Sequence, residues 1–410
     1  MWGSRGKLPA TIEGVIPMAF LTEYDKQFTT PEDICAHVGD EYAKFGGAIV
    51  PPIYQNSLFV QPTDVNGVTT NEFVYTRVAN PTIEIAERKI AALEGAEGAL
   101  CFSAGMGAIS SAIMHFVKKD CHVVLVGTSY GPTMTFIRNY LAKRFGVTHT
   151  LVVGNCVKEI ENAIEPNTTL IYLESPSSGV FMMQDLEKIA AIAKAKGIGT
   201  VIDNSYATPI HQQPIKHGID ISVHTASKYL GGHSDIVAGA LAANREIIES
   251  IQHEERELLG NIMDPHQAWL LIRGIRTLPV RLKQHGESAR KVAAFLEKHP
   301  KVEKVFYPGS ETYGQPELFE KYLSGDNGLM SFTVKANDEQ TVKFMNSLHF
   351  FQRGVSWGGF ESLVAPIGWT EENEKYGIPK HLVRIHVGLE SVDTLIADLD
   401  KCLNAIPDAE

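Results

Sequence analysis

The sequence predicts an α/β protein built around a mostly parallel sheet that is covered by helices on both faces. Short runs rich in Val, Ile and Leu alternate with amphipathic stretches of helical length, which is typical of βαβ units. The composition, with 44% hydrophobic and 21% charged residues, is that of a globular protein, and 410 residues suffice for two or three domains. The predicted strands are 99–102, 122–126, 148–153, 169–174, 199–203 and 219–225, and the predicted helices between them are 82–94, 132–145 and 184–196.

Three segments follow one another along the chain. Residues 1–62 form a predicted N-terminal arm, and their composition fits a segment laid on another surface as well as a loosely ordered terminus. Residues 63–264 form the main α/β domain. Residues 265–410 form a predicted smaller α+β domain, because strands mix with helices there. Its expected helices are 281–299, 339–348 and 392–403, and its expected strands are 302–307, 329–334 and 382–387.

Charge and cysteine content exclude several classes of protein. The net charge is −11, from 37 Lys and Arg against 48 Asp and Glu, and no basic tract occurs, so we expect neither nucleic acid nor a membrane as partner. The uncharged run 98–117 contains polar residues within a strand-then-helix pattern, so it does not predict a membrane span.

Five cysteines without a CxxC pair indicate a reducing compartment, and with the poor signal-peptide pattern they predict a cytoplasmic protein. No HExxH or other metal motif occurs, so no metal site is expected.

Polar residues follow or end several of the predicted strands. In a parallel sheet, residues at the carboxyl ends of strands face the ligand crevice. This rule selects Ser103, Glu174, Asp203 and Thr225.

A lysine and an aspartate stand out among these strand ends. Lys228 follows a predicted buried strand amid small hydroxyl residues, although lysine normally seeks water. Asp203 ends the preceding strand, 25 residues earlier (228 − 203). A partly buried lysine amine forms a Schiff base readily, and a carboxylate keeps a pyridine nitrogen protonated. The pair therefore predicts a site for pyridoxal 5'-phosphate (PLP).

The segment Phe102-Ser-Ala-Gly-Met-Gly-Ala-Ile-Ser110 follows a strand and opens a helix, whose free N–H groups suit a phosphate. Thr225 and Ser227 could complete this cradle, or could satisfy backbone groups at the strand end. The same glycines resemble a dinucleotide-binding GxGxxG, but the third position is a serine and the next strand ends without an acid. A nicotinamide-dependent oxidoreductase is therefore the less favoured alternative.

Seven motifs in one order resemble the PLP-dependent trans-sulfuration enzymes of cysteine and methionine metabolism, from about residue 45 to the C-terminus. The resemblance implies the aspartate-aminotransferase-like fold, called fold type I. The motifs are Tyr75-Thr-Arg-Val-Ala-Asn-Pro-Thr, Phe102-Ser-Ala-Gly-Met, Leu173-Glu-Ser-Pro, Val201-Ile-Asp-Asn, Ser227-Lys-Tyr-Leu-Gly-Gly-His-Ser-Asp, Ser356-Trp-Gly-Gly-Phe-Glu-Ser-Leu and Val383-Arg-Ile-His-Val-Gly-Leu-Glu.

The resemblance implies cofactor contacts for nine residues. Lys228 is the Schiff-base lysine and proton shuttle, and Tyr130 stacks on the ring and takes part in proton transfer, so both are catalytic. Tyr75 and Arg77 reach the phosphate of the neighbouring subunit. The remaining cofactor residues are Asp203 at the pyridine nitrogen and, at the phosphate, Gly105, Met106, Thr225 and Ser227.

The resemblance also implies how the amino-acid substrate is bound. Arg384 clamps the α-carboxylate as a bidentate fork, which lysine cannot copy. Ser356 lies nearby, and the other candidate substrate residues are Ser178, Trp357 and Val355. Because Tyr75 and Arg77 would serve the other subunit, we expect at least a dimer, with a homotetramer as the assembly.

The motifs give mixed indications of the reaction. Ser178 and Gly179 replace the Asn-Pro of many family members, and here the chain resembles the cystathionine β-lyase branch. Val355 instead occupies a position where such β-lyases have tyrosine and methionine γ-lyase-like enzymes have an aliphatic residue. The sequence therefore favours a carbon–sulfur lyase that releases homocysteine, pyruvate and ammonia from cystathionine. The alternatives are γ-elimination or γ-replacement on methionine, cystathionine or an activated homoserine, and a PLP-binding protein without lyase turnover.

Overall fold

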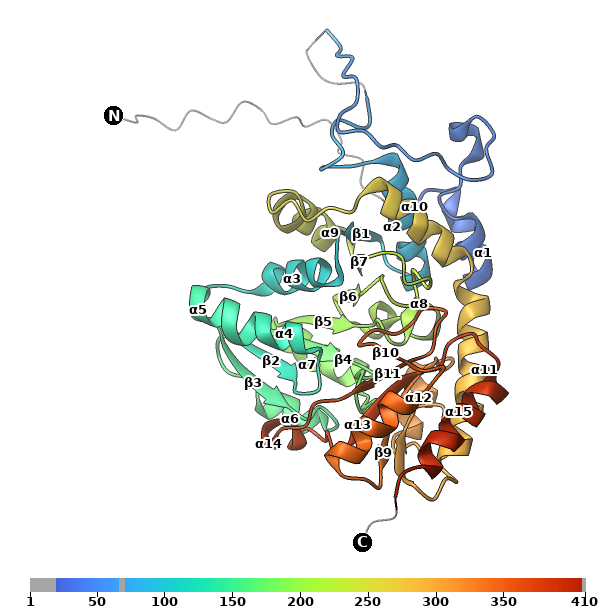
Figure 1. Cartoon of the computed structure of the whole chain (residues 1–410). Helices are drawn as coiled ribbons and strands as arrows, with labels where there is room; N and C mark the ends of the chain where they lie inside the picture. The colour runs from blue at the N-terminus through green and yellow to red at the C-terminus, as the bar shows by residue number, and fades with distance from the viewer. Residues whose placement is uncertain (1–19, 66–70, 408–410) are drawn as a thin grey trace.

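The computed structural model describes residues 20–65 and 71–407, which form two packed sheets with helices around them (Figure 1). The first sheet has seven strands in the order β1-β7-β6-β5-β4-β2-β3, and its pairs from β6 through β5, β4 and β2 to β3 are parallel. The strands are β1 (Gly98–Phe102), β2 (His122–Val126), β3 (Thr148–Val152), β4 (Thr168–Glu174), β5 (Gly199–Asp203), β6 (Ile221–His224) and β7 (Gly239–Ala243). The predicted mostly parallel α/β fold is confirmed.

One strand of this sheet was not predicted. β7 pairs antiparallel with both β1 and β6. Its sequence, Gly-Ala-Leu-Ala-Ala, has none of the β-branched residues that mark a strand. Small side chains there allow close packing, since a Cβ on Gly239 would overlap the main chain of Ala104.

Alternate residues of the first sheet face two separate apolar clusters. One cluster holds Leu125 and Tyr172 with residues of α3 (Gly105–Phe116) and α9 (Arg245–Ile251). The other holds Val124 and Leu173 with residues of the helices on the opposite face. These are α2 (Pro81–Glu94), α6 (Val157–Asn162), α7 (Leu186–Lys196) and α10 (Pro265–Arg276). Successive side chains of a strand point to opposite faces of the sheet, and here both faces are buried. The sequences of these strands are therefore continuous apolar runs.

The stretch predicted as one helix over 132–145 is divided. It comprises α4 (Gly131–Thr135), a π-helical segment η3 (Phe136–Leu141) and α5 (Ala142–Phe145). The short helix α8 (Thr208–His211) and the turn η4 (Pro214–His217) lie between β5 and β6, and η5 (Gln252–Arg256) continues α9.

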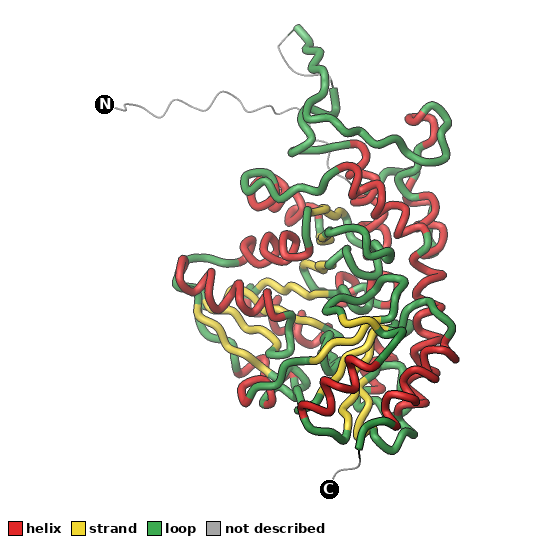
Figure 2. The backbone as a smooth tube through the Cα atoms, in the orientation of Figure 1, coloured by secondary structure: helices red, strands yellow, loops and turns green. Residues whose placement is uncertain are grey.

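The second sheet is smaller and mostly antiparallel, in the order β10-β11-β12-β9-β8. Its strands lie among helices, as Figure 2 shows. Its strands are β8 (Val302–Phe306), β9 (Leu329–Val334), β10 (Gln352–Arg353), β11 (Leu363–Pro366) and β12 (Leu382–His386). The helices of this region are α11 (Leu278–Leu296), α12 (Pro316–Tyr322), α13 (Asp338–Ser347), α14 (Glu371–Glu374) and α15 (Val392–Asn404). Helices α11, α13 and α15 share an apolar cluster with Val383 and Ile385 of β12, so Arg384 points from the opposite face.

The described part of the predicted arm has two portions. The first carries η1 (Asp25–Gln27), α1 (Pro31–His37) and η2 (Tyr42–Phe45), and it is joined to α2 by the buried ion pair of Asp25 with Arg88, 2.6 Å apart. The second portion, residues 46–62, extends away from the two sheets at the top of Figure 1. Residues 1–19 of the arm lie outside the described residues. The division at 62 and 264 stays a prediction, and α10, which follows 264, packs on α2.

No helix in the described ranges is long and apolar enough to cross a membrane.

Candidate active site

The candidate lysine lies in the turn between β6 and β7. Lys228 donates a hydrogen bond from Nζ to Oγ of Ser356, 2.6 Å away, and its ammonium lies 5.3 Å from the centre of the Trp357 ring. Burial, with help from the positive charge of Arg384, lowers the pKa of Lys228 to about 8. A larger share of this amine is therefore neutral near pH 7 than for an exposed lysine, as a nucleophile or base requires.

Two carboxyl groups end adjacent parallel strands beside this lysine. Asp203 of β5 and Glu174 of β4 are register partners, and both are buried. Burial, together with the negative charge of Asp203, raises the pKa of Glu174 to about 7. Burial also raises the pKa of Asp203, while hydrogen bonds from Ser205 and the charges of His224 and Lys228 act in the opposite direction. A cationic ring nitrogen would favour the charged form of Asp203 further.

A second buried pair lies behind Asp203. Nε2 of His224 is 2.5 Å from Oε1 of Glu94, and the same oxygen accepts hydrogen bonds from Ser222 and Asn204. Ser205 also links the two strand ends, because its N–H donates to Asp203 and its hydroxyl accepts the N–H of Thr225. The strand-end rule found Asp203 and Thr225, but no local pattern marked Ser205 or Glu94.

The predicted phosphate cradle lies where β1 meets α3. Helix α3 begins at Gly105 without a side-chain cap, so its first N–H groups remain available for an anion. A Cβ on Gly105 would overlap the side chain of Thr225, which places this glycine and threonine together as predicted. Asn261, which sequence reasoning missed, reaches the same helix end and hydrogen-bonds to Ser103. The hydroxyl of Ser227 is engaged with the main chain of Ala238, so its phosphate contact stays a prediction.

The second sheet brings the predicted substrate residues to the same place. Arg384 donates from Nη1 to the carbonyl of Ser178, 3.1 Å away, and from Nη2 to the carbonyl of Val355, 2.9 Å away. Burial lowers the pKa of its guanidinium. The side chain of Val355 is 85% exposed, Ser356 is exposed and Trp357 is buried. Hydrogen bonds thus join Arg384 to Ser178 and Val355, and Lys228 to Ser356. The two sets form one group because Val355 and Ser356 are neighbours in the chain.

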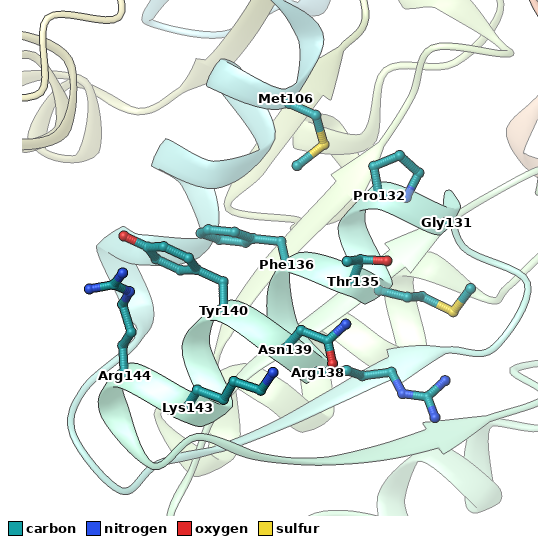
Figure 3. Close-up of a pocket in the computed structure, with 11 residues that line it drawn as sticks. Met106, Gly131, Pro132, Thr135, Phe136, Arg138, Asn139, Tyr140, Lys143 and Arg144 are labelled. Atoms are coloured by element: carbon teal, nitrogen blue, oxygen red, sulfur yellow. The ribbon is translucent and has the colours of Figure 1, made fainter.

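Met106 and Gly131, the residue after Tyr130, line an open hollow of about 1,200 Å³ (Figure 3). Tyr130 precedes Gly131 at the start of α4 and is 46% exposed, while Met106 lines the hollow itself. The other lining residues come from α4, η3 and α5 and include three cationic side chains, Arg138, Lys143 and Arg144.

Tyr75 and Arg77 stand apart from this group. The guanidinium of Arg77 lies 5.7 Å from the ring centre of Tyr75 and donates to the main chain of Glu257, 3.1 Å away. Both residues line another hollow, of about 500 Å³, with Met263 and neighbouring residues. Among the described residues, neither side chain hydrogen-bonds to Lys228, Asp203 or Arg384.

Taken together, a partly neutral amine, a buried carboxylate and an uncapped helix start fit the aldehyde, ring nitrogen and phosphate of PLP. This combination defines a PLP-dependent α/β enzyme.

Comparison with known proteins identifies the family. The model of the Cys/Met metabolism PLP-dependent enzymes matches residues 32–404, and the chain belongs to this family. Its cofactor is therefore PLP, and the predicted membership is confirmed.

Individual relatives include enzymes of two specificities. The L-methionine gamma-lyase of Fusobacterium nucleatum is 38% identical over 88% of this chain and 94% of the relative. The cystathionine beta-lyase of Lactococcus lactis is 37% identical over 90% of this chain and 97% of the relative. The crystal structure of metB from Corynebacterium glutamicum superposes with a TM-score of 0.87 at 33% identity, covering 93% of this chain and 99% of that one. The chain is thus similar to lyases that act at the β- and the γ-carbon, and the predicted carbon–sulfur lyase class is supported.

Proposed function

We propose that this enzyme cleaves the carbon–sulfur bond of a thioether amino acid by α,γ-elimination, as its similarity to the gamma-lyases suggests. The sequence alone favoured β-elimination of cystathionine. The comparisons support the γ-reaction at least as well, with 38% identity to a methionine gamma-lyase. The observation that carries the lyase chemistry is the group of Lys228, Ser356 and Arg384 beside Asp203.

The residues of this chain divide the work of the reaction. When bound, PLP withdraws electrons from the substrate's α-carbon, which makes its proton removable. Lys228, with its lowered pKa, takes that proton, and in a γ-elimination also moves a proton at the β-carbon. Asp203 holds its carboxylate toward the ring nitrogen. Arg384 orients the substrate by its carboxylate, and Tyr130, the residue that the resemblance assigns to proton transfer, protonates the departing sulfur.

Elimination at the β-carbon remains the second candidate, on a specific observation. Ser178 and Gly179 stand where many family members have Asn-Pro, and the Ser178 carbonyl is a partner of Arg384. This segment resembles the β-lyase branch. No comparable observation favours the nicotinamide-dependent oxidoreductase, since the family is PLP-dependent.

A keto-acid assay on the purified enzyme distinguishes the two eliminations. We expect 2-oxobutyrate from methionine or cystathionine, with a thiol and ammonia. Pyruvate from cystathionine would instead establish the β-reaction. No keto acid from cystathionine, cysteine, methionine or homocysteine would contradict the lyase proposal.

We also propose that the active site is completed by a second subunit, in a dimer or a tetramer built from dimers. Tyr75 and Arg77 belong to the phosphate contacts by resemblance, yet in this chain they line another hollow. The segment before them exposes apolar side chains, and Val60 is 81% exposed. Such exposed apolar residues are typical of an interface.

The five free cysteines fit a cytoplasmic location, which we propose as well.

Mixed oligomers test whether Arg77 acts on the other subunit. A Lys228→Ala chain and an Arg77→Ala chain are each expected to be inactive. If Arg77 acts across the interface, a mixed dimer contains one intact site, so refolding the two chains together restores about a quarter of wild-type activity. No recovery in verified mixed dimers would show that Arg77 acts within its own chain.

A further inference from the structure

Glu174 touches two loops that carry predicted site residues. It is the last residue of β4 and only 4% exposed. Its Oε2 accepts the N–H of Tyr130, and its Oε1 accepts the N–H of Ser178, each at 2.7 Å. One carboxyl group thus joins two chain segments that are 48 residues apart in sequence (178 − 130).

The contact with Tyr130 fixes the start of α4. Tyr130 is the N-cap of this five-residue helix and makes no side-chain cap of its own. The hydrogen bond that its N–H donates to Glu174 is therefore a restraint on the backbone from which the Tyr130 ring projects. Such hydrogen bonds to a carboxyl group are stronger than neutral ones when it is ionised.

The contact with Ser178 continues to the substrate side. The carbonyl of Ser178 accepts a hydrogen bond from Nη1 of Arg384. The series Tyr130, Glu174, Ser178 and Arg384 is thus continuous, from the proposed ring-stacking residue to the proposed carboxylate clamp. Asp203, the register partner of Glu174, lies on the adjacent strand.

We propose that Glu174 is a positioning residue that holds Tyr130 and Arg384 in one fixed arrangement. In this role it acts through the two main-chain amides and not through contact with substrate or cofactor. The inference rests on the proposed roles of Tyr130 and Arg384, and it holds for β- and γ-elimination alike.

The chain contains a matched control for this arrangement. Glu159 also accepts two backbone N–H groups, from Val153 at 3.0 Å and Gly154 at 3.1 Å. These amides follow β3, the edge strand, and belong to no predicted site residue. Replacing each glutamate therefore shows what happens when a carboxylate that accepts two backbone N–H groups is lost inside the candidate site and outside it.

The experiment compares the Glu174→Gln and Glu159→Gln holoenzymes. A glutamine keeps one acceptor oxygen but presents an NH2 group to the second amide. The probe is glycine, which carries the α-amino and α-carboxylate groups without a leaving group, and its binding is followed by visible absorbance. We expect E174Q to bind glycine about tenfold more weakly, because an amide N–H loses its partner and Ser178 shifts beneath Arg384. Its visible circular dichroism changes as well, because Tyr130 moves against the cofactor ring.

For E159Q we expect a glycine affinity within about twofold of wild type and an unchanged visible circular dichroism. This should hold even if its thermal unfolding temperature is lowered as much as that of E174Q. Equal changes in both variants, or neither change in E174Q, would overturn the proposal.

If E174Q does not fold, Glu174→Asp takes its place. It keeps a carboxylate and shortens its reach by one methylene, and the same weakening of glycine binding is expected. Glycine binding as in wild type would then overturn the proposal. Because glycine reports no elimination, an enzyme that binds it normally yet releases no keto acid contradicts the proposed function alone.

Discussion

In the seven-stranded sheet, Glu174 and Asp203 stand at the carboxyl ends of neighbouring parallel strands, whereas in the five-stranded sheet Arg384 lies in the middle of β12. The first pair is buried. The substrate-side residues Val355 and Ser356 are exposed, on the loop between β10 and β11. From this difference we infer a division of labour, in which the first sheet sets the protonation chemistry and the second sheet with its loops recognises the substrate. Substitution of Asp203 should therefore lower kcat or cofactor binding, and substitutions in the second region should raise KM or change the product. Glu174, which is linked to Arg384 by hydrogen bonds, is expected to affect substrate binding as well.

The largest effect is expected at Lys228. Lys228→Ala removes the proposed base and the covalent anchor, so kcat should fall at least about 1,000-fold. The visible absorbance of the lysine-bound cofactor should disappear, and borohydride should no longer attach the cofactor to the peptide that contains residue 228. A variant that still couples covalently to PLP through a lysine would contradict this assignment.

A smaller effect of another kind is expected in the second sheet. Arg384→Lys keeps the positive charge but loses the two-pronged donor, so KM should rise about 10- to 100-fold with little change in cofactor absorbance. Steady-state kinetics with cofactor titration separates the two quantities. If kcat fell while KM stayed constant, the division between the two sheets would be wrong.

The pH dependence of cofactor capture tests the environment of Lys228. Only the neutral amine attacks the aldehyde, and the pKa of Lys228 is lowered to about 8. The rate at which apoenzyme takes up PLP should therefore rise about tenfold per pH unit below pH 8 and level off above it. Stopped-flow absorbance measures this rate, with PLP and free lysine as the control. A rate that climbs without a plateau to about pH 10, as for an unperturbed lysine, would contradict the lowered pKa.

The smallest effect is expected at Val355. Its side chain is exposed while its carbonyl accepts from Arg384, so Val355→Tyr leaves that hydrogen bond in place. A tyrosine there, as in the β-lyases that the motif resembles, should raise the ratio of pyruvate to 2-oxobutyrate from cystathionine about fivefold. This corresponds to about 1 kcal/mol, the low end for a pocket contact, because the side chain is exposed. Val355→Leu is the matched control and should leave the ratio unchanged. An unchanged ratio in both variants would remove Val355 from the specificity determinants.

The parallel strands were predicted well, because buried strands of Val, Ile and Leu between amphipathic helices have a strong pattern. Strands 122–126 and 199–203 have the predicted bounds. β7, β10 and β11 were missed, since β7 is built from small residues and the other two have only two and four residues. The single helix predicted over 132–145 contains a π-helical segment, which residue periodicity does not reveal.

The candidate site was predictable where a strand end marks it. Asp203, Glu174 and Thr225 follow from that rule, and Lys228 follows from a lysine in an unusual setting. Arg384 and Ser356 required the resemblance to the family, because a lone arginine within a strand has no distinctive pattern. The specificity was not predictable, because relatives of both kinds share about the same identity with this chain.

The sequence by itself determined the fold class and the cofactor, and it singled out Lys228 as the candidate lysine, because hydrophobic periodicity and short motifs are local properties. Only the tertiary structure decided which distant groups meet. It placed Glu174 between Tyr130 and Ser178, Ser356 on Lys228, and Arg384 on the carbonyls of Ser178 and Val355. It also left Tyr75 and Arg77 outside that group. The physical reason is that hydrogen bonds between residues far apart in the chain depend on how the two sheets pack, and no short stretch of sequence encodes that packing.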